Sequence, residues 1–311
     1  MRAALFAIAA IVGIVACNPP PSLGTTASAP ALAPAPAPAQ APVASAPAAP
    51  PYDLAADRDQ RLLDARRELG ATIPATIEAD VFVVAGPGAP GTVDFIRRTL
   101  AAYFHGRFDK RPARAISVYM FASAAPYEAY CKTSIGEACF SPFGFYLPSR
   151  RLIVMNAGPG IGTLSHELVH PIVETDFPDA PTWLDEGIAS LFEAPVLARS
   201  REGAEIHGAK NWRWPRLVAA LGTKAEKDEV RLDALFGMSN TRFRGDAERL
   251  HYASARYVCQ WLDARGQLWP FYRAWRDGKA SDPTGEKSFL AVTGKTPRDA
   301  NEEWTAWVKR L

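Results

Sequence analysis

A low-complexity stretch rich in proline and alanine, with a little serine and threonine, fills residues 18–51, and it limits the part of the 311-residue chain that can fold. The stretch offers too little apolar surface to form a core, and its Ala-Pro alternation favours extended polyproline II backbone. At ~3.1 Å per residue such a segment can reach about 100 Å. The folded part is therefore expected to begin near residue 52, with residues 17–51 serving as a disordered linker.

The residues before this stretch have the pattern of an export signal. A basic residue, Arg2, precedes an apolar run over residues 5–14 that is too short to cross a bilayer. The run ends in Ile14-Val15-Ala16-Cys17, which resembles a bacterial lipobox. The resemblance implies a signal peptide over residues 1–16, lipid on Cys17, and an exported lipoprotein bound to a membrane of the cell envelope. Asn18 is compatible with the outer membrane, facing the periplasm. An ordinary signal peptide cleaved nearby is the alternative.

The remaining cysteines fit an oxidising compartment. Cys131 and Cys139 flank a short segment that contains a glycine, so they are the natural disulfide pair, with two free thiols as the alternative. Cys259 lies in an apolar helical run, which is typical of a buried small hydrophobic residue.

Charge excludes one class of partner. The formal net charge is +2, and no basic stripe marks a surface for phosphates, so a nucleic-acid binder is not expected.

The patterns of residues 52–160 alternate between helix and strand. Helices are expected over 52–69, 92–104 and 124–131, and strands over 81–84 and 116–121. Two more strands, over 143–147 and 152–156, are expected to form a hairpin. After Gly160 the pattern is helical to the C-terminus. The sequence predicts an α+β fold, in which a small mixed sheet with helices (52–160) precedes a mainly helical part (161–311).

The segment His166-Glu167-Leu168-Val169-His170 has the HExxH pattern of a zinc site. Residues four apart on a helix share one face, so both imidazoles can bind one ion, with Glu167 beside them. We expect Thr163 to cap this helix and Pro171 to kink or end it. Apolar side chains fill the opposite half of the helix: Leu164, Leu168, Val169, Ile172 and Val173.

A second motif follows 12 residues after His170, in the segment Thr-Trp-Leu-Asp-Glu-Gly-Ile-Ala-Ser over residues 182–190. Thr182 with Asp185 resembles a capping box, so a second helix is expected to start there. Catalytic zinc sites use three protein ligands and leave one position open, and Glu186 can supply the third ligand. Asp185 and Glu174 are weaker candidates for this ligand, and a solvated Glu186 is the alternative without a site.

Together the two motifs resemble the gluzincin metallopeptidases, in particular the bacterial peptidase MA-like family, in which a strand hairpin and HExxH precede a helix with Trp-Leu-x-Glu-Gly-x-Ala. The matching segment is Trp183-Leu184-Asp185-Glu186-Gly187-Ile188-Ala189. The resemblance implies one Zn²⁺ per chain on His166, His170 and Glu186, with Glu167 as general base, and hydrolysis of a peptide or protein substrate. The Gly-x-Met-Glu-Asn segment of the aminopeptidase branch is missing before His166, which favours an endopeptidase.

The same resemblance implies further residues. Related gluzincins carry a tyrosine some 60-odd residues after the glutamate ligand. Here Tyr252 follows Glu186 by 66 residues, so the resemblance implies that Tyr252 stabilises the oxyanion. His251 is the alternative donor, and a core tyrosine the alternative role. Such peptidases bind extended substrates along an edge strand, which implies this role for residues 152–156, with Gly144, Phe145 and Tyr146 lining the cleft. Some gluzincins place an acid where Ser190 stands here, so the partners of the zinc-binding imidazoles stay unassigned.

Other functions fit the same motifs. A catalytically inactive peptidase-like binding lipoprotein and an envelope-assembly factor are the alternatives, and a zinc hydrolase of non-peptide substrates also stays open. The other histidines, His105, His207 and His251, form no ligand-spaced pair and are expected to be structural or surface residues.

Overall fold

The structure is a computed structural model that describes residues 51–199 and 203–311. The predicted signal peptide (1–16), the lipid on Cys17 and the linker up to residue 50 lie outside the described residues and stay predictions. Within those ranges, no helix combines the length and the apolar character needed to cross a membrane.

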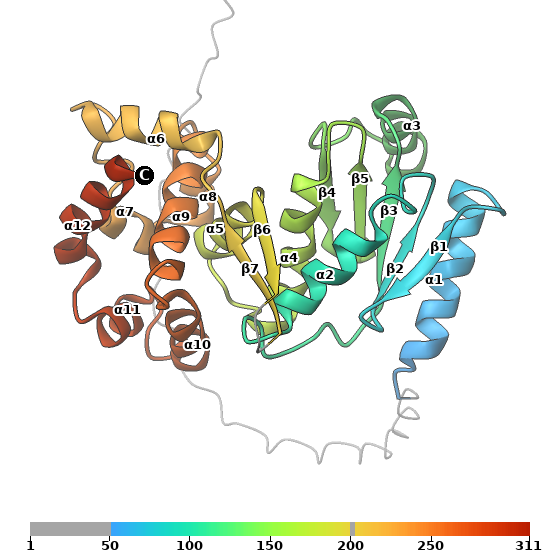
Figure 1. Cartoon of the computed structure of the whole chain (residues 1–311), viewed down its shortest axis with the longest axis horizontal. Coiled ribbons are helices and arrows are strands. Elements are labelled where there is room, and N and C mark those ends of the chain that lie inside the picture. The colour runs from blue at the N-terminus through green and yellow to red at the C-terminus, as the bar shows by residue number, and fades with distance from the viewer. Residues whose placement is uncertain (1–50, 200–202) are drawn as a thin grey trace, which may run out of the picture. The chain divides into compact units, whose positions relative to one another are not determined.

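A five-stranded mixed sheet forms the first part of the fold (Figure 1). Its order is β1-β2-β3-β5-β4, in which β2, β3 and β5 run parallel while β1 and β4 pair antiparallel at the two edges. The three parallel strands are buried along their whole length, as strands covered on both faces must be. The strands are β1 (Ala75–Glu78), β2 (Phe82–Ala85), β3 (Ile116–Phe121), β4 (Gly144–Leu147) and β5 (Leu152–Asn156).

The predicted hairpin is present, but its edge strand is the other one. β5 pairs with β3 on one side and with β4 on the other, so β4 lies at the edge and the prediction for residues 152–156 is wrong. β5 is buried along its whole length, as is typical of a central strand, whereas Tyr146 and Leu147 of β4 are only partly buried. Gly144, Phe145 and Tyr146 are therefore the residues of the edge.

Helices cover both faces of the sheet. On one face α1 (Leu54–Leu69) and α3 (Ala124–Tyr130) share an apolar cluster with β3 and β5. On the other face α2 (Val93–Tyr103) and α4 (Gly162–Asp176) enter the main core. A disulfide joins Cys131 to Cys139 and closes the loop that follows α3. The α+β fold predicted from the sequence is confirmed.

The second part of the chain is mostly helical, but a hairpin of β6 (Pro195–Arg199) and β7 (Ala204–Gly208) interrupts it. The expectation of helix from Gly160 to the C-terminus is therefore wrong. Ile206 is buried between side chains that are less buried, which is the alternation of a strand. The helices are α5 (Thr182–Leu191), α6 (Arg213–Gly222), α7 (Leu232–Phe236), α8 (Asn240–Phe243), α9 (Glu248–Asp263), α10 (Leu268–Gly278), α11 (Glu286–Thr293) and α12 (Pro297–Arg310).

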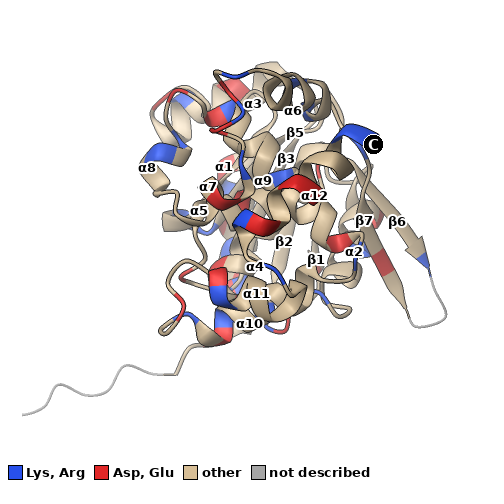
Figure 2. Ribbon diagram, turned by 90° about the vertical axis from the view of Figure 1, so that its left-hand side faces the viewer, with Lys and Arg blue, Asp and Glu red and all other residues tan. Residues whose placement is uncertain are grey.

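Figure 2 shows acidic and basic residues distributed along these helices, whereas the tryptophans of their interior are fully buried: Trp183, Trp261, Trp275 and Trp304. Trp183 of α5 lies 5.7 Å from Trp275 of α10, measured between ring centroids, and Phe236 of α7 stacks on the same indole. This aromatic core fixes α5 against the C-terminal helices.

The glycine of the second motif permits a close approach of α5 to α9. A Cβ atom at Gly187 would lie 2.8 Å from Sγ of Cys259 and 3.0 Å from the carbonyl oxygen of Ala255. Cys259 is fully buried and unpaired, and burial raises the pKa of its thiol. Because Gly187 follows Glu186, this contact also sets the position of the predicted third ligand.

Replacement of Gly187 by alanine is expected to destabilise the protein by about 1–3 kcal/mol, because the added methyl group overpacks the contact between α5 and α9. Urea unfolding measures the change. The double variant Gly187→Ala/Cys259→Ala should recover part of the loss, since only the carbonyl of Ala255 then crowds the new methyl group.

Gly222→Ala is the matched control, because a Cβ atom at Gly222 meets nothing within 4 Å. Equal unfolding midpoints for wild type and Gly187→Ala would contradict the close approach.

Candidate metal centre

The two motifs occupy consecutive helices, α4 and α5, whose ends differ from the sequence prediction. α4 starts at Gly162, so Thr163 lies inside the first turn and does not cap it. α4 also continues beyond Pro171 to Asp176, with Pro171 buried in its interior. α5 starts at Thr182 after Pro181, and no side chain caps it, so the capping box of Thr182 with Asp185 is absent.

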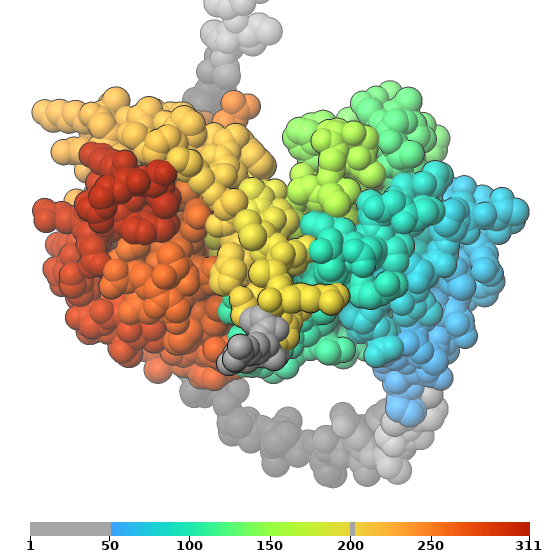
Figure 3. All heavy atoms as spheres, viewed as in Figure 1, coloured from blue at the N-terminus to red at the C-terminus, as the bar shows by residue number. Residues whose placement is uncertain are grey.

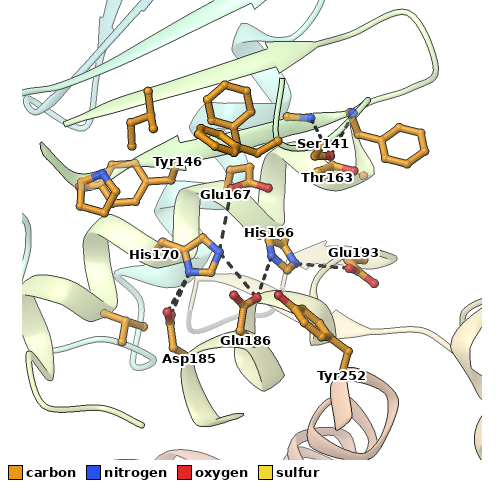
Figure 4. A pocket seen from close by; sticks show the side chains of 18 of the residues that line it. Ser141, Tyr146, Thr163, His166, Glu167, His170, Asp185, Glu186, Glu193 and Tyr252 are labelled. Atoms are coloured by element: carbon orange, nitrogen blue, oxygen red, sulfur yellow. Dashed lines mark hydrogen bonds and ion pairs between the residues drawn. The ribbon is translucent and has the colours of Figure 1, made fainter. Parts of the chain in front are cut away.

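The three predicted ligands come together where α4 faces α5 (Figure 4). The metal-binding atoms of His166, His170 and Glu186 all lie within 4.8 Å of one another. Oε2 of Glu186 is 3.3 Å from Nε2 of His166 and 4.0 Å from Nε2 of His170. Figure 4 shows the three side chains pointing toward one another, with Glu167 beside them.

The donor set fits a zinc ion. Within the described residues, buried Oε2 of Glu186 makes no hydrogen bond, and its charged neighbours are the Nε2 atoms of His166 and His170, at 3.3 and 4.0 Å. An orphaned buried carboxylate oxygen is costly unless a cation or a donor satisfies it. Two imidazoles and one carboxylate, with room for a fourth partner, form the ligand set of many catalytic zinc sites.

The electrostatics of these residues reflect their closeness. Burial disfavours the charged form of His166, but Glu186, Glu193 and Glu167 outweigh burial and raise its pKa well above the usual range. Burial would raise the pKa of Glu186, yet His170, His166 and Arg244 lower it strongly. Without a metal, protons on the imidazoles balance the buried carboxylates.

Each imidazole has a carboxylate at its other nitrogen. Nδ1 of His170 lies 3.0 Å from both oxygens of Asp185, and Nδ1 of His166 lies 3.4 Å from Oε1 of Glu193. Arg213 donates to Glu193 at 2.7 Å and holds it in place. Such carboxylates orient the rings and increase their basicity.

The sequence left these two partners unassigned. Asp185 was considered as a ligand or as a helix-end charge, and the structure places it on His170 instead. Glu193 lies two residues beyond the end of α5 at Leu191, so helical spacing from Glu186 does not indicate it. Ser190, at the place of the acid in some gluzincins, has a buried hydroxyl with no partner.

Glu167 lies between the imidazoles and the edge of the sheet. Its carboxylate is 6% exposed, and Oε2 is 4.0 Å from Nε2 of His170. Burial raises the pKa of Glu167, against the opposing charges of His166 and His170. A carboxylate with a raised pKa can both accept and return a proton near neutral pH.

A cleft of about 1210 Å³ opens onto these residues. Its walls include the edge strand with Gly144, Phe145 and Tyr146, and the start of α9 with Tyr252. Figure 3 shows a hollow between the atoms of the sheet and those of the helical part, at residues 140–150 and 210–220. The predicted substrate-binding residues and Tyr252 thus share one cleft with the candidate ligands.

The other candidates lie elsewhere or have other partners. Glu174 accepts a hydrogen bond from the hydroxyl of Tyr146 at 2.7 Å and is not part of the ligand group. His251 is buried, with Nδ1 at 3.0 Å from the carbonyl of Phe243 and Nε2 at 3.2 Å from Glu229. His105 and His207 are exposed and lie outside the lining of the cleft.

Residues 160–280 match a family described as "Protein of unknown function (DUF1570)". The matched segment runs from just before α4 to the end of α10 and contains His166, Glu167, His170, Glu186 and Tyr252. No curated protein matches the chain.

The affinity for zinc is expected to increase with pH up to about 9. Burial lowers the pKa of His170, but Asp185 and Glu186 outweigh burial and raise it to about 9. At neutral pH zinc must therefore displace protons, which costs about tenfold in affinity per pH unit for each proton. Calorimetric titration in buffers of different ionisation enthalpy measures the released protons, and a constant affinity between pH 6 and 9 would contradict this.

Proposed function

We propose that the protein is a zinc-dependent endopeptidase. The lipid predicted on Cys17 would hold it at the cell envelope. The main support is the convergence of His166, His170 and Glu186 beside the buried carboxylate of Glu167. A resident metal with an adjacent base, in a cleft bordered by a free sheet edge, is suited to hydrolysis of extended peptides.

In this proposal His166, His170 and Glu186 hold one zinc ion. When bound, zinc polarises a carbonyl oxygen and lowers the pKa of water to about 7. Glu167 accepts the proton of the attacking water and passes it to the amine that leaves. The raised pKa of Glu167 suits the first transfer, because a carboxylate that binds its proton more tightly is the stronger base.

Tyr252 is the candidate partner for the oxyanion. Its side chain points into the cleft close to Glu186 (Figure 4). Nη1 of Arg244 donates to the oxygen of Tyr252 at 2.5 Å, so the hydroxyl hydrogen can turn either to the neighbouring carboxylate of Glu186 or to a substrate oxygen. A donor at the position where negative charge develops lowers the barrier of acyl transfer.

The edge strand supplies the backbone for substrate binding. The carbonyl of Phe143 accepts from the backbone N–H of Asn156, and antiparallel pairs alternate between bonded and non-bonded residues. The backbone groups of Gly144 and Tyr146 therefore point away from β5, toward the cleft. An extended peptide could add there as a further strand, with its scissile bond near Glu167.

Exposed aromatic side chains at the cleft suggest which peptides bind. Phe140, Phe143 and Trp212 line it and are 60%, 48% and 63% exposed. The disulfide at Cys139 precedes Phe140 directly, and Ser141 accepts hydrogen bonds from the backbone of the next residues, so this rim is held rigidly. Apolar residues flanking the scissile bond would cover these rings.

Glu167→Gln is expected to reduce peptide cleavage on the order of 10²–10⁴-fold while zinc binding persists, because only the proton transfer is lost. Cleavage of an unbiased peptide library and metal analysis are measured on the same samples.

The matched control is Glu174→Gln on the same helix, which should retain most activity, since an amide oxygen still accepts from Tyr146. Full zinc occupancy without any cleavage by the wild type would instead support a catalytically inactive binding protein. Equal cleavage by wild type and Glu167→Gln would contradict the assigned base.

Phe143→Ser is expected to lower kcat/KM about tenfold for peptides with an apolar residue at the site of cleavage. The serine covers less of the apolar side chain of the substrate, which stays more exposed to water. Peptides with polar residues there should change little. Leu290→Ser, an exposed apolar residue outside the cleft, serves as control. A uniform loss over all peptides would argue against a role in selectivity.

A further inference from the structure

Arg244 connects the third ligand to the residue proposed for the oxyanion. The residue directly follows α8, and its guanidinium reaches across to both groups. Nη2 lies 2.5 Å from Oε1 of Glu186, and Nη1 lies 2.5 Å from the hydroxyl oxygen of Tyr252. Its side chain is 50% exposed and lines the cleft, whereas that of Glu186 is buried. No sequence pattern indicated this residue.

This contact leaves the two oxygens of Glu186 in different states. Oε1 is bound to the guanidinium, while Oε2 has no hydrogen bond and faces the Nε2 atoms of His166 and His170. A carboxylate can otherwise rotate or bind a metal through both oxygens. A charge-assisted hydrogen bond to Oε1 holds that oxygen at the guanidinium and so restricts rotation of the carboxylate.

We propose that Arg244 is a positioning residue that makes Glu186 a single-oxygen metal ligand and holds Tyr252 beside it. This inference rests on the proposed function, since it assumes that His166, His170 and Glu186 bind zinc. Because the guanidinium binds Oε1, only Oε2 coordinates the metal, and a further coordination position stays open.

A role in charge alone predicts the opposite effect. A guanidinium beside a cation site repels the cation, so removal of this charge should strengthen zinc binding. If Arg244 instead orients Glu186, its removal frees the carboxylate and should weaken zinc binding. The sign of the change therefore separates the two roles.

The test measures zinc dissociation constants by competition with a chromogenic chelator for wild type, Arg244→Gln and Arg244→Lys. We expect both variants to bind zinc about 10–100-fold more weakly. Lysine keeps the charge, but its single ammonium group lacks the planar fork that bridges two oxygens. The visible absorption of the cobalt-substituted protein should shift in both variants, since the coordination of Glu186 changes.

Arg242→Gln is the matched control, because Arg242 lies two residues away, pairs with Glu229 and does not line the cleft. Its zinc affinity and cobalt spectrum should equal those of the wild type.

Equal or tighter zinc binding by Arg244→Gln, with an unchanged cobalt spectrum, would overturn the inference while leaving the peptidase proposal intact. Absence of zinc binding by the wild type would overturn the proposed function itself. Circular dichroism checks that the variants fold. If Arg244→Gln does not fold, the zinc affinity and cobalt spectrum of Arg244→Lys test the inference.

Discussion

The buried carboxylate of Glu186 is the group on which the arrangement of the site depends. A carboxylate that is 4% exposed must find positive or metal partners, because an unpaired buried charge is very costly. Its charged partners are the imidazoles of α4 and the guanidinium of the residue after α8. The close contact of α5 with α9 at Gly187 fixes the backbone beside it. Charge pairing and helix packing thus position the same atom.

The buried charges alternate in sign through the site. Glu193, His166, Glu186, His170 and Asp185 form a continuous series of contacts, and Arg213 and Arg244 neutralise its acids from outside. Their neighbours in this series shift the pKa values of Glu193, His166, Glu186 and His170, so protonation of the imidazoles and ionisation of these carboxylates are linked. A divalent cation can replace the protons without leaving any of these acids unpaired.

Local patterns could be predicted from the sequence, and tertiary partners could not. The strands Phe82–Ala85 and Ile116–Phe121 were evident because both of their faces are apolar, whereas β1, β6 and β7 are not buried along their length and carry polar or charged residues. The spacing of His166 and His170 is a property of one helix, so their shared face followed directly. The strand order, and with it the edge position of β4, depends on pairing between distant residues. The contact of Arg244 with Glu186 spans 58 positions, and no periodicity encodes it.

The free edge of β4 has a consequence for the behaviour of the protein in solution. A strand with unpaired backbone groups can pair with another protein molecule as readily as with a short peptide, which leads to aggregation. Here the edge has only four residues, and side chains of the helical part, among them Trp212 and Tyr252, line the opposite wall of the cleft. A single extended chain needs less room in such a cleft than the intact sheet of a second molecule. The geometry that presents the edge to a flexible chain therefore also limits self-association.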